Sequence, residues 1–135
     1  MANGKLGSST ITFAAGAGGS DYILVYTVPP LKIASIKIHI SRLQSDTNGI
    51  GSAMPFYTYI STTNTPTEAD LVSISNLYAP GFSAANTGGG PFPSSETLSG
   101  LVLSAGEKVF VRATYYYGYI NVGTARVNGY EDTVV

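Results

Sequence analysis

The stretch that decides the fold is Ile33-Ala-Ser-Ile-Lys-Ile-His-Ile40, where the isoleucines at positions 36, 38 and 40 alternate with Lys37 and His39. Successive side chains of a strand point to opposite faces, so this segment has one apolar and one polar face. Strands of this kind are typical of antiparallel sheets that lie on a core with one side and face water with the other. The segment therefore predicts such a strand.

Seven further runs rich in β-branched and aromatic residues flank this strand, separated by breaks that contain Gly, Pro and Asn. No apolar period of 3.6 residues lasts for three turns, and the only helical feature is one turn with a capping-box variant at 67–70. The sequence predicts a single all-β domain over residues 1–135, an antiparallel β-sandwich or jelly-roll-like fold with about eight strands and little or no helix. The predicted strands cover residues 9–13, 22–28, 33–40, 56–61, 71–77, 98–103, 108–117 and 119–128.

The parts outside these strands are short extended ends at 1–8 and 129–135 and one long connection at 78–96. Long connections without periodicity are uncommon in compact domains and are often functional. We expect the ends or the 78–96 loop to reach toward neighbouring proteins.

The composition argues against catalysis. The 135 residues include no Cys, one His and only 11% charged residues, with a net charge of -1. Catalysis needs converging titratable groups, or a metal or cofactor held by them, and no such cluster is visible. We expect no enzyme activity, no catalytic or metal-binding residues and no cofactor. The low charge means low self-repulsion, which suits a protein that packs beside copies of itself.

The same residues limit the partners and the location. The weakly acidic balance lacks the basic stripe that nucleic-acid binding requires, so we expect no nucleic-acid partner. No segment resembles a signal peptide or a membrane-spanning helix, so we expect synthesis in a host cytoplasm and no membrane insertion.

The few titratable groups have structural interpretations. His39 alternates with Lys37 and is expected to face solvent or an interface. The pair Glu68 and Asp70 fits the start of the helical turn, and Glu131 with Asp132 fits a solvated tail. The glycine runs at 16–19 and 88–90 lack the residues that a phosphate-binding loop needs and are assigned to turns.

The candidate interaction surface is the tyrosine run Tyr115-Tyr-Tyr-Gly-Tyr119. Tyrosine offers rigid amphipathic area that suits interfaces and sugar stacking, although tyrosines at the rim of a core remain the alternative. The residues assigned to this surface are Tyr115, Tyr116, Tyr117 and Tyr119, together with Pro91 and Phe92 of the long loop.

Two stretches carry a resemblance to a known group of proteins. The first stretch is Tyr26-Thr-Val-Pro-Pro, which leads into the alternating strand. The second is Leu103-Ser-Ala-Gly-Glu-Lys-Val-Phe-Val111, which predicts a hairpin in the last third of the chain. Together with their flanks they resemble small β-sandwich virion proteins of tailed bacteriophages. The chain departs from that pattern at 30–32, where a Gly commonly makes the turn.

The resemblance implies a structural protein of the virion, either a capsid cement (decoration) protein or a tail component. We expect a homo-oligomer, with a trimer favoured, that binds phage capsid or tail proteins. The alternative is a carbohydrate- or receptor-binding module of a tail tip or baseplate, with Tyr115–Tyr119 as a stacking platform for a glycan. A small hydrolase is the third alternative, but the sequence shows no nucleophile–base pair that would support it.

Overall fold

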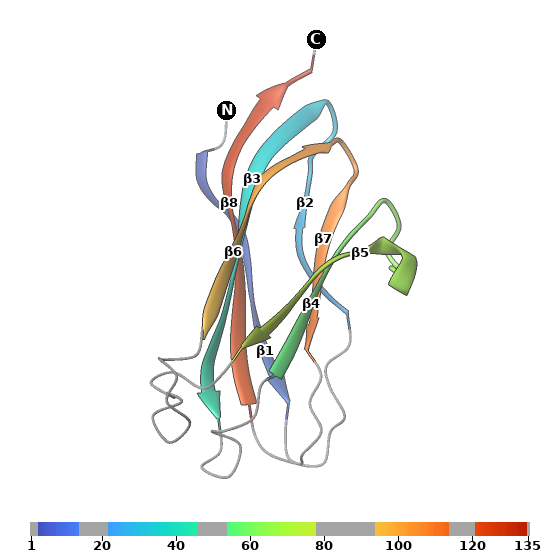
Figure 1. Ribbon diagram of the computed structural model, residues 1–135. Coiled ribbons are helices and arrows are strands. Elements are labelled where there is room, and N and C mark those ends of the chain that lie inside the picture. Colours follow the sequence, from blue (N-terminus) through green and yellow to red (C-terminus); the bar gives the residue numbers. More distant parts are fainter. Residues whose placement is uncertain (1–2, 14–21, 46–53, 78–93, 114–120, 135) are drawn as a thin grey trace.

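The computed structural model describes residues 3–13, 22–45, 54–77, 94–113 and 121–134 (Figure 1). These residues form eight strands and one three-residue 3₁₀ turn, η2 (Glu68–Asp70). No helix among them is long and apolar enough to cross a membrane. The strands are β1 (Asn3–Phe13), β2 (Ile23–Thr27), β3 (Lys32–Ser45), β4 (Met54–Ser61), β5 (Leu71–Leu77), β6 (Ser95–Ser104), β7 (Lys108–Ala113) and β8 (Asn121–Thr133).

The strands form two four-stranded antiparallel sheets, in the orders β1-β8-β3-β6 and β2-β7-β4-β5. Every connection except that between β4 and β5 takes the chain from one sheet to the other. Eight strands wound across two sheets in this order form a jelly roll. The predicted fold class, an all-β antiparallel sandwich of the jelly-roll kind, is confirmed.

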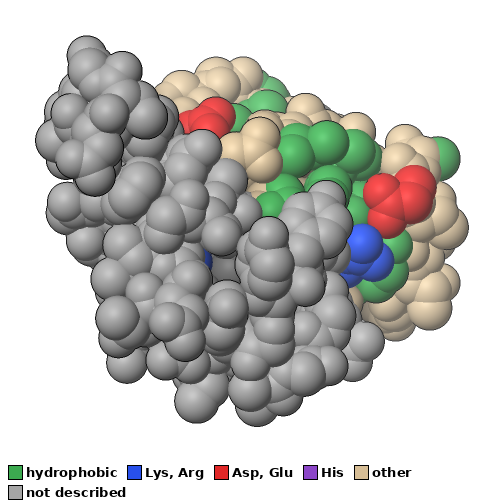
Figure 2. Space-filling view, turned by 60° about the horizontal axis from the view of Figure 1, so that its bottom comes forward, with side chains coloured by type: hydrophobic (Ala, Val, Ile, Leu, Met, Phe, Trp, Pro, Cys, Tyr) green, Lys and Arg blue, Asp and Glu red, His purple; other side chains and the backbone are tan. Residues whose placement is uncertain are grey.

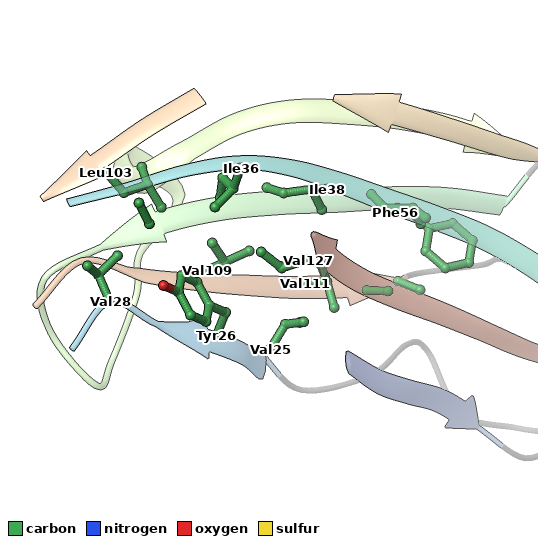
Figure 3. Close-up of a cluster of buried hydrophobic side chains, with 14 of the residues drawn as sticks. Val25, Tyr26, Val28, Ile36, Ile38, Phe56, Leu103, Val109, Val111 and Val127 are labelled. Atoms are coloured by element: carbon green, nitrogen blue, oxygen red, sulfur yellow. The ribbon is translucent and has the colours of Figure 1, made fainter. Parts of the chain in front are cut away.

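The core lies between the two sheets and is built by the predicted alternation. In β3, Ile36, Ile38 and Ile40 are buried, while Lys37 is exposed on the outer face. Figure 3 shows side chains from both sheets pointing toward one another, among them Phe56 of β4. Each buried side chain of this size contributes about 1.5–3 kcal/mol relative to an exposed one.

Two turns at one end of the sandwich bond to each other. β6 and β7 lie in different sheets, so the predicted hairpin between them is wrong. Gly106, at a φ of +84°, forms the tight turn that joins them. Its N–H donates to the carbonyl of Val28, and the N–H of Val28 donates to the carbonyl of Glu107. These bonds tie the β6–β7 turn to the segment that connects β2 with β3.

The first and last strands, together with β6, are longer than the sequence predicts. Residues 3–8 pair with β8, and residues 129–133 pair with β3, although both were expected as extended ends. Residues 95–96 of the predicted loop belong to β6. The rest of that loop up to residue 93, the glycine runs 16–19 and 88–90, and the predicted strand residues at 114–120 lie outside the described residues.

The prediction that Glu131 is a solvated tail residue is wrong. Its side chain is only 8% exposed, because β8 continues past it and turns it toward the space between the sheets. There its Oε2 accepts a hydrogen bond of 2.6 Å from the hydroxyl of Tyr26. A buried carboxylate needs such a donor, since burial without one is costly. Asp132, the next residue, is exposed as predicted.

Candidate functional site

The sequence-predicted surface cannot be placed on the fold. Tyr115, Tyr116, Tyr117 and Tyr119 lie in the segment 114–120, and Pro91 and Phe92 in the segment 78–93, all outside the described residues. Their role stays a prediction. The described residues contain two other surfaces with distinct chemistry, one on the outer face of each sheet.

The outer face of the β2-β7-β4-β5 sheet carries two rows of apolar and aromatic side chains. In the first row, Tyr59 pairs with Phe110, which pairs with Leu24. In the second row, Ile74 pairs with Tyr57, which pairs with Arg112, and Tyr22 lies beside the arginine. We call this surface the aromatic face. Its residues are Tyr22, Leu24, Tyr57, Tyr59, Ile74, Phe110 and Arg112.

Arg112 holds the second row together. Its guanidinium carbon lies 5.3 Å from the ring centroid of Tyr22 and 5.5 Å from that of Tyr57. These distances are within the range of cation–π attraction. The Nε of Arg112 is buried without a hydrogen-bond partner, so the stacking on the two rings is its principal described contact.

The turn η2 closes one side of the aromatic face. The Oε1 of Glu68 accepts hydrogen bonds of 3.0 Å from the hydroxyls of both Tyr22 and Tyr59. The rings of these tyrosines meet edge to face at 4.9 Å. Tyr59 has no exposed surface. Burial, followed by the hydrogen bond and charge of Glu68, raises the pKa of Tyr59 well above its ordinary value.

Glu68 and Asp70 both lie in the first turn of η2 as expected, but Glu68 has a further role. Asp70 does cap the turn, since its Oδ2 accepts a hydrogen bond of 2.9 Å from the N–H of Thr67. Glu68, in contrast, reaches back over β4 to the two tyrosine hydroxyls. Of the first acidic pair, Asp70 therefore stabilises the turn and Glu68 binds the tyrosines of the aromatic face.

The rim of the aromatic face is apolar and open. Leu24, Val72 and Ile74 are each about half exposed, at 47%, 51% and 52%. Figure 2 shows hydrophobic side chains gathered on the visible surface of the molecule, with a basic and an acidic group at their margin. Tyrosine and arginine are the residue types that most often dominate protein interfaces. The aromatic face thus has the composition of a contact surface.

The outer face of the β1-β8-β3-β6 sheet is different, because it is hollowed and basic. The hollow has a volume of about 760 Å³. Its charged lining residues are Lys5 of β1, Lys37 of β3 and Arg126 of β8, and no acidic side chain is among the described residues that line it. We call this the basic hollow.

The strand register explains how these cations come together. Asn128 of β8 pairs with Lys5 on one side and with Lys37 on the other. Arg126 lies two residues before Asn128 and therefore on the same face. None of the three cations hydrogen-bonds or forms an ion pair with another described residue. Next to them, Tyr130, Ser35 and Val102 form a row across three strands, and Tyr130 and Val102 are well exposed.

The single histidine lies on this same outer face, where it was expected. Its Nδ1 lies 2.9 Å from Thr97 Oγ1 and its Nε2 lies 3.1 Å from Ser41 Oγ. A serine beside an imidazole is one element of nucleophilic catalysis. Here β3 lies between β6 and β8, so its backbone N–H groups serve the two ladders and are not available as an oxyanion hole. In the part of the chain that the structure describes, no acidic side chain orients His39 and no cluster of ligands could hold a metal ion.

Sequence reasoning missed both surfaces for the same reason. The alternation in β4 places Tyr57 and Tyr59 on the face opposite the core residue Phe56, a signal that could have found the aromatic part of the first surface. The contribution of Arg112, and the meeting of Lys5 with Arg126, depend on strand pairing that a single sequence does not display. Comparison of the chain with protein-family models and with curated proteins finds no match.

Proposed function

We propose that the protein is a non-enzymatic structural protein of a tailed-phage particle, which forms a homo-oligomer and binds the virion surface as a capsid decoration protein. The observation that carries this proposal is the aromatic face. In two-sheet sandwiches the outer faces are ordinarily polar. The exposed apolar side chains of Leu24, Val72 and Ile74 on such a face favour an interaction site.

The self-association follows from the chemistry of that face. Leu24, Val72 and Ile74 lose contact with water when a second copy covers them, and the stacked Arg112 supplies polar contacts at low entropic cost. The net charge of only -1 opposes such packing very little. Closed point-group symmetry is the usual result of such contacts, most often as a dimer. A trimer, which fits a local three-fold axis of a capsid, forms where the aromatic face contacts a different surface of the next copy.

The link to a virion rests on the resemblance in sequence and is consistent with the fold. Jelly rolls occur in viral capsid proteins and in lectins, so the architecture suits a particle component without identifying one. On a repeated lattice, several weak contacts of one oligomer add to strong attachment.

The proposal that the protein is not an enzyme is supported by the structural hydrogen bonds of its acidic side chains. Glu131 binds the Tyr26 hydroxyl, Glu68 binds two tyrosines and Asp70 caps a turn. Glu107 accepts a hydrogen bond from the N–H of Ser104. These acids serve the fold.

The oligomer is tested by measuring the mass of the purified protein by light scattering after size exclusion. We expect a trimer for the natural chain and a monomer for the double variant Leu24→Lys, Ile74→Lys. The control is Leu31→Lys, which adds one lysine at a leucine that is 72% exposed at a turn outside the aromatic face, and it should stay trimeric. A monomeric natural chain, or a double variant that assembles normally, would contradict the proposal.

The attachment to the virion needs a separate experiment. Mass spectrometry of gradient-purified phage particles should detect the chain at a fixed ratio to the major capsid protein. The double variant should be depleted from the particles, since a monomer loses the multivalent attachment. If the natural chain is missing from purified particles, it is not a virion component.

A further inference from the structure

We propose that the basic hollow on the β1-β8-β3-β6 sheet binds an acidic saccharide, a short sugar chain that carries carboxylate groups. This goes beyond the contact function proposed above and uses the opposite outer face of the sandwich. It rests on three observations: uncompensated charge, neutral hydrogen-bonding groups beside the cations, and a hollow of suitable size.

The charge is the first observation. Lys5 and Lys37 lie on the two sides of Asn128, about 10 Å from each other across two strand spacings, and Arg126 is diagonal to both at about 7–8 Å. Among the described residues, no acid lines the hollow and none of the three cations is paired. Three neighbouring like charges repel one another, and a bound anion relieves this repulsion while it gains charge-assisted hydrogen bonds.

The neutral groups decide the kind of anion. Asn128 offers an amide between Lys5 and Lys37, and Ser35 offers a hydroxyl on the far side of Lys37 from Arg126. Both groups match the hydroxyl groups of a sugar. Tyr130, which is 46% exposed, presents an aromatic ring at the side of the hollow. An aromatic ring provides a stacking surface for the apolar face of a pyranose.

The hollow is an open depression of the surface, and its size suits a small ligand. The volume of about 760 Å³ lies within the range of about 300–1,000 Å³ that is typical of small-molecule sites. The lining includes the backbone of Gly4 and Gly100, where a Cβ would meet no atom within 4 Å, so these positions leave the hollow open. Nucleic acid would require a longer basic stripe than three cations provide.

The direct test is isothermal titration calorimetry of the full chain with a trisaccharide of galacturonic acid. The matched probe is the same trisaccharide with its carboxylates methyl-esterified. We expect binding of the acid form, at least tenfold weaker binding of the ester, and weaker binding of the acid form as salt is raised, because exposed charges are screened.

Variants assign the binding to the hollow. Lys37→Gln and Arg126→Gln should each lower the affinity about fivefold or more, because each removes a charge-assisted contact. Lys108→Gln is the matched control, since Lys108 lies on β7 in the other sheet and donates only to the carbonyl of Gly106. Tyr130→Phe should bind normally, and Tyr130→Ala should bind more weakly. Thermal melting of every variant checks that the fold is retained.

Several outcomes would overturn the proposal. Equal binding of the acid and the ester would show that charge does not contribute to binding. Unchanged binding by Lys37→Gln and Arg126→Gln would show that the saccharide does not bind in the hollow. Tighter binding of a poly-aspartate peptide than of the trisaccharide would assign the hollow to an acidic protein partner. The variant Leu24→Lys, Ile74→Lys should bind the trisaccharide like the natural chain, so failure of oligomerisation and failure of saccharide binding are separable.

Discussion

Leu31 occupies a turn position that favours glycine. The N–H of Lys32 donates to the carbonyl of Pro29 at 3.3 Å, and Leu31 has a φ of +61°. Pro at the second and a positive φ at the third position are the marks of a type II turn, where glycine is the usual third residue. The resemblance to phage proteins pointed to the same departure at 30–32. The leucine side chain is 72% exposed, so little packing offsets the strain.

Replacing this leucine should therefore stabilise the protein. The left-handed conformation destabilises the folded protein by about 1–2 kcal/mol when the residue is leucine. Glycine removes this strain, but its greater freedom in the unfolded chain offsets about 0.5–1 kcal/mol of the gain. We expect Leu31→Gly to raise the free energy of unfolding by about 0.5–1 kcal/mol, measured by urea denaturation. Leu31→Ala is the control, because it removes the side chain but keeps the Cβ. If both variants have the same stability, the turn is not strained.

At the scale of elements, β8 depends on one glycine. Gly129 lies opposite Ile36 of β3 and has a φ of +152°. A Cβ at this position would lie 1.9 Å from the carbonyl oxygen of Ser35, an approach that no side chain can make. β8 and β3 are the two inner strands of their sheet, so any displacement here disturbs every ladder in it.

Gly129→Ala should accordingly lower the free energy of unfolding by about 3 kcal/mol or more, from the steric clash together with the backbone strain. Gly100→Ala is the comparison, since Gly100 has a φ of +76° but open space around it. That variant should lose only about 1–2 kcal/mol, the cost of the left-handed conformation. Similar losses for the two variants in chemical denaturation would show that the clash with Ser35 is absent.

The elements differ in how far a single sequence predicts them. The strand 71–77 has the predicted bounds, and the alternation in 33–40 correctly separates core from outer face, because both depend on neighbours in the chain. β1 begins six residues before its predicted start, at Asn3, since its first part contains glycines and no alternation. Gly7 belongs there because a Cβ would lie 2.2 Å from the carbonyl oxygen of Val25. Such close approach between strands is a tertiary requirement.

In the candidate surfaces too, features that depend on neighbours in the chain could be predicted, and features that depend on tertiary contacts could not. Placing Tyr57 and Tyr59 away from the core needed only the period of β4. Bringing Lys5 beside Asn128 needed the pairing of the first strand with the last, across more than 120 residues. The buried role of Glu131 could not be predicted either, because it depends on Tyr26 in the opposite sheet.

At the scale of the whole molecule, the two outer faces of the sandwich have opposite characters. One is aromatic, with exposed Leu24 and Ile74, and the other is hollowed and basic. A homo-oligomer that buries the aromatic face keeps the basic hollow on its outside, where a ligand can reach it. The jelly roll thus separates the proposed assembly surface from the proposed binding surface by the thickness of its core.

The stability of the whole molecule should fall steeply in alkaline solution. Burial, and next the hydrogen bond to a carboxylate, raises the pKa of Tyr26 beside Glu131 and of Tyr59 beside Glu68. Both pKa values lie above that of an unfolded tyrosine, about 10. The unfolded chain therefore releases these protons first, and the stabilisation is full below pH 10 and declines as the pH rises toward the folded values.

The expected slope above pH 10 is about 1.4 kcal/mol per pH unit for each tyrosine, hence about 2.8 kcal/mol for both. Urea denaturation at pH 9, 10 and 11 measures it. The double variant Tyr26→Phe, Tyr59→Phe has no such protons to lose, so its stability should depend less on pH over this interval although it is lower at pH 9. The lysines titrate in the same range in both proteins, and the difference between the two slopes therefore isolates the tyrosines. Parallel slopes would mean that neither hydroxyl is held protonated by the fold.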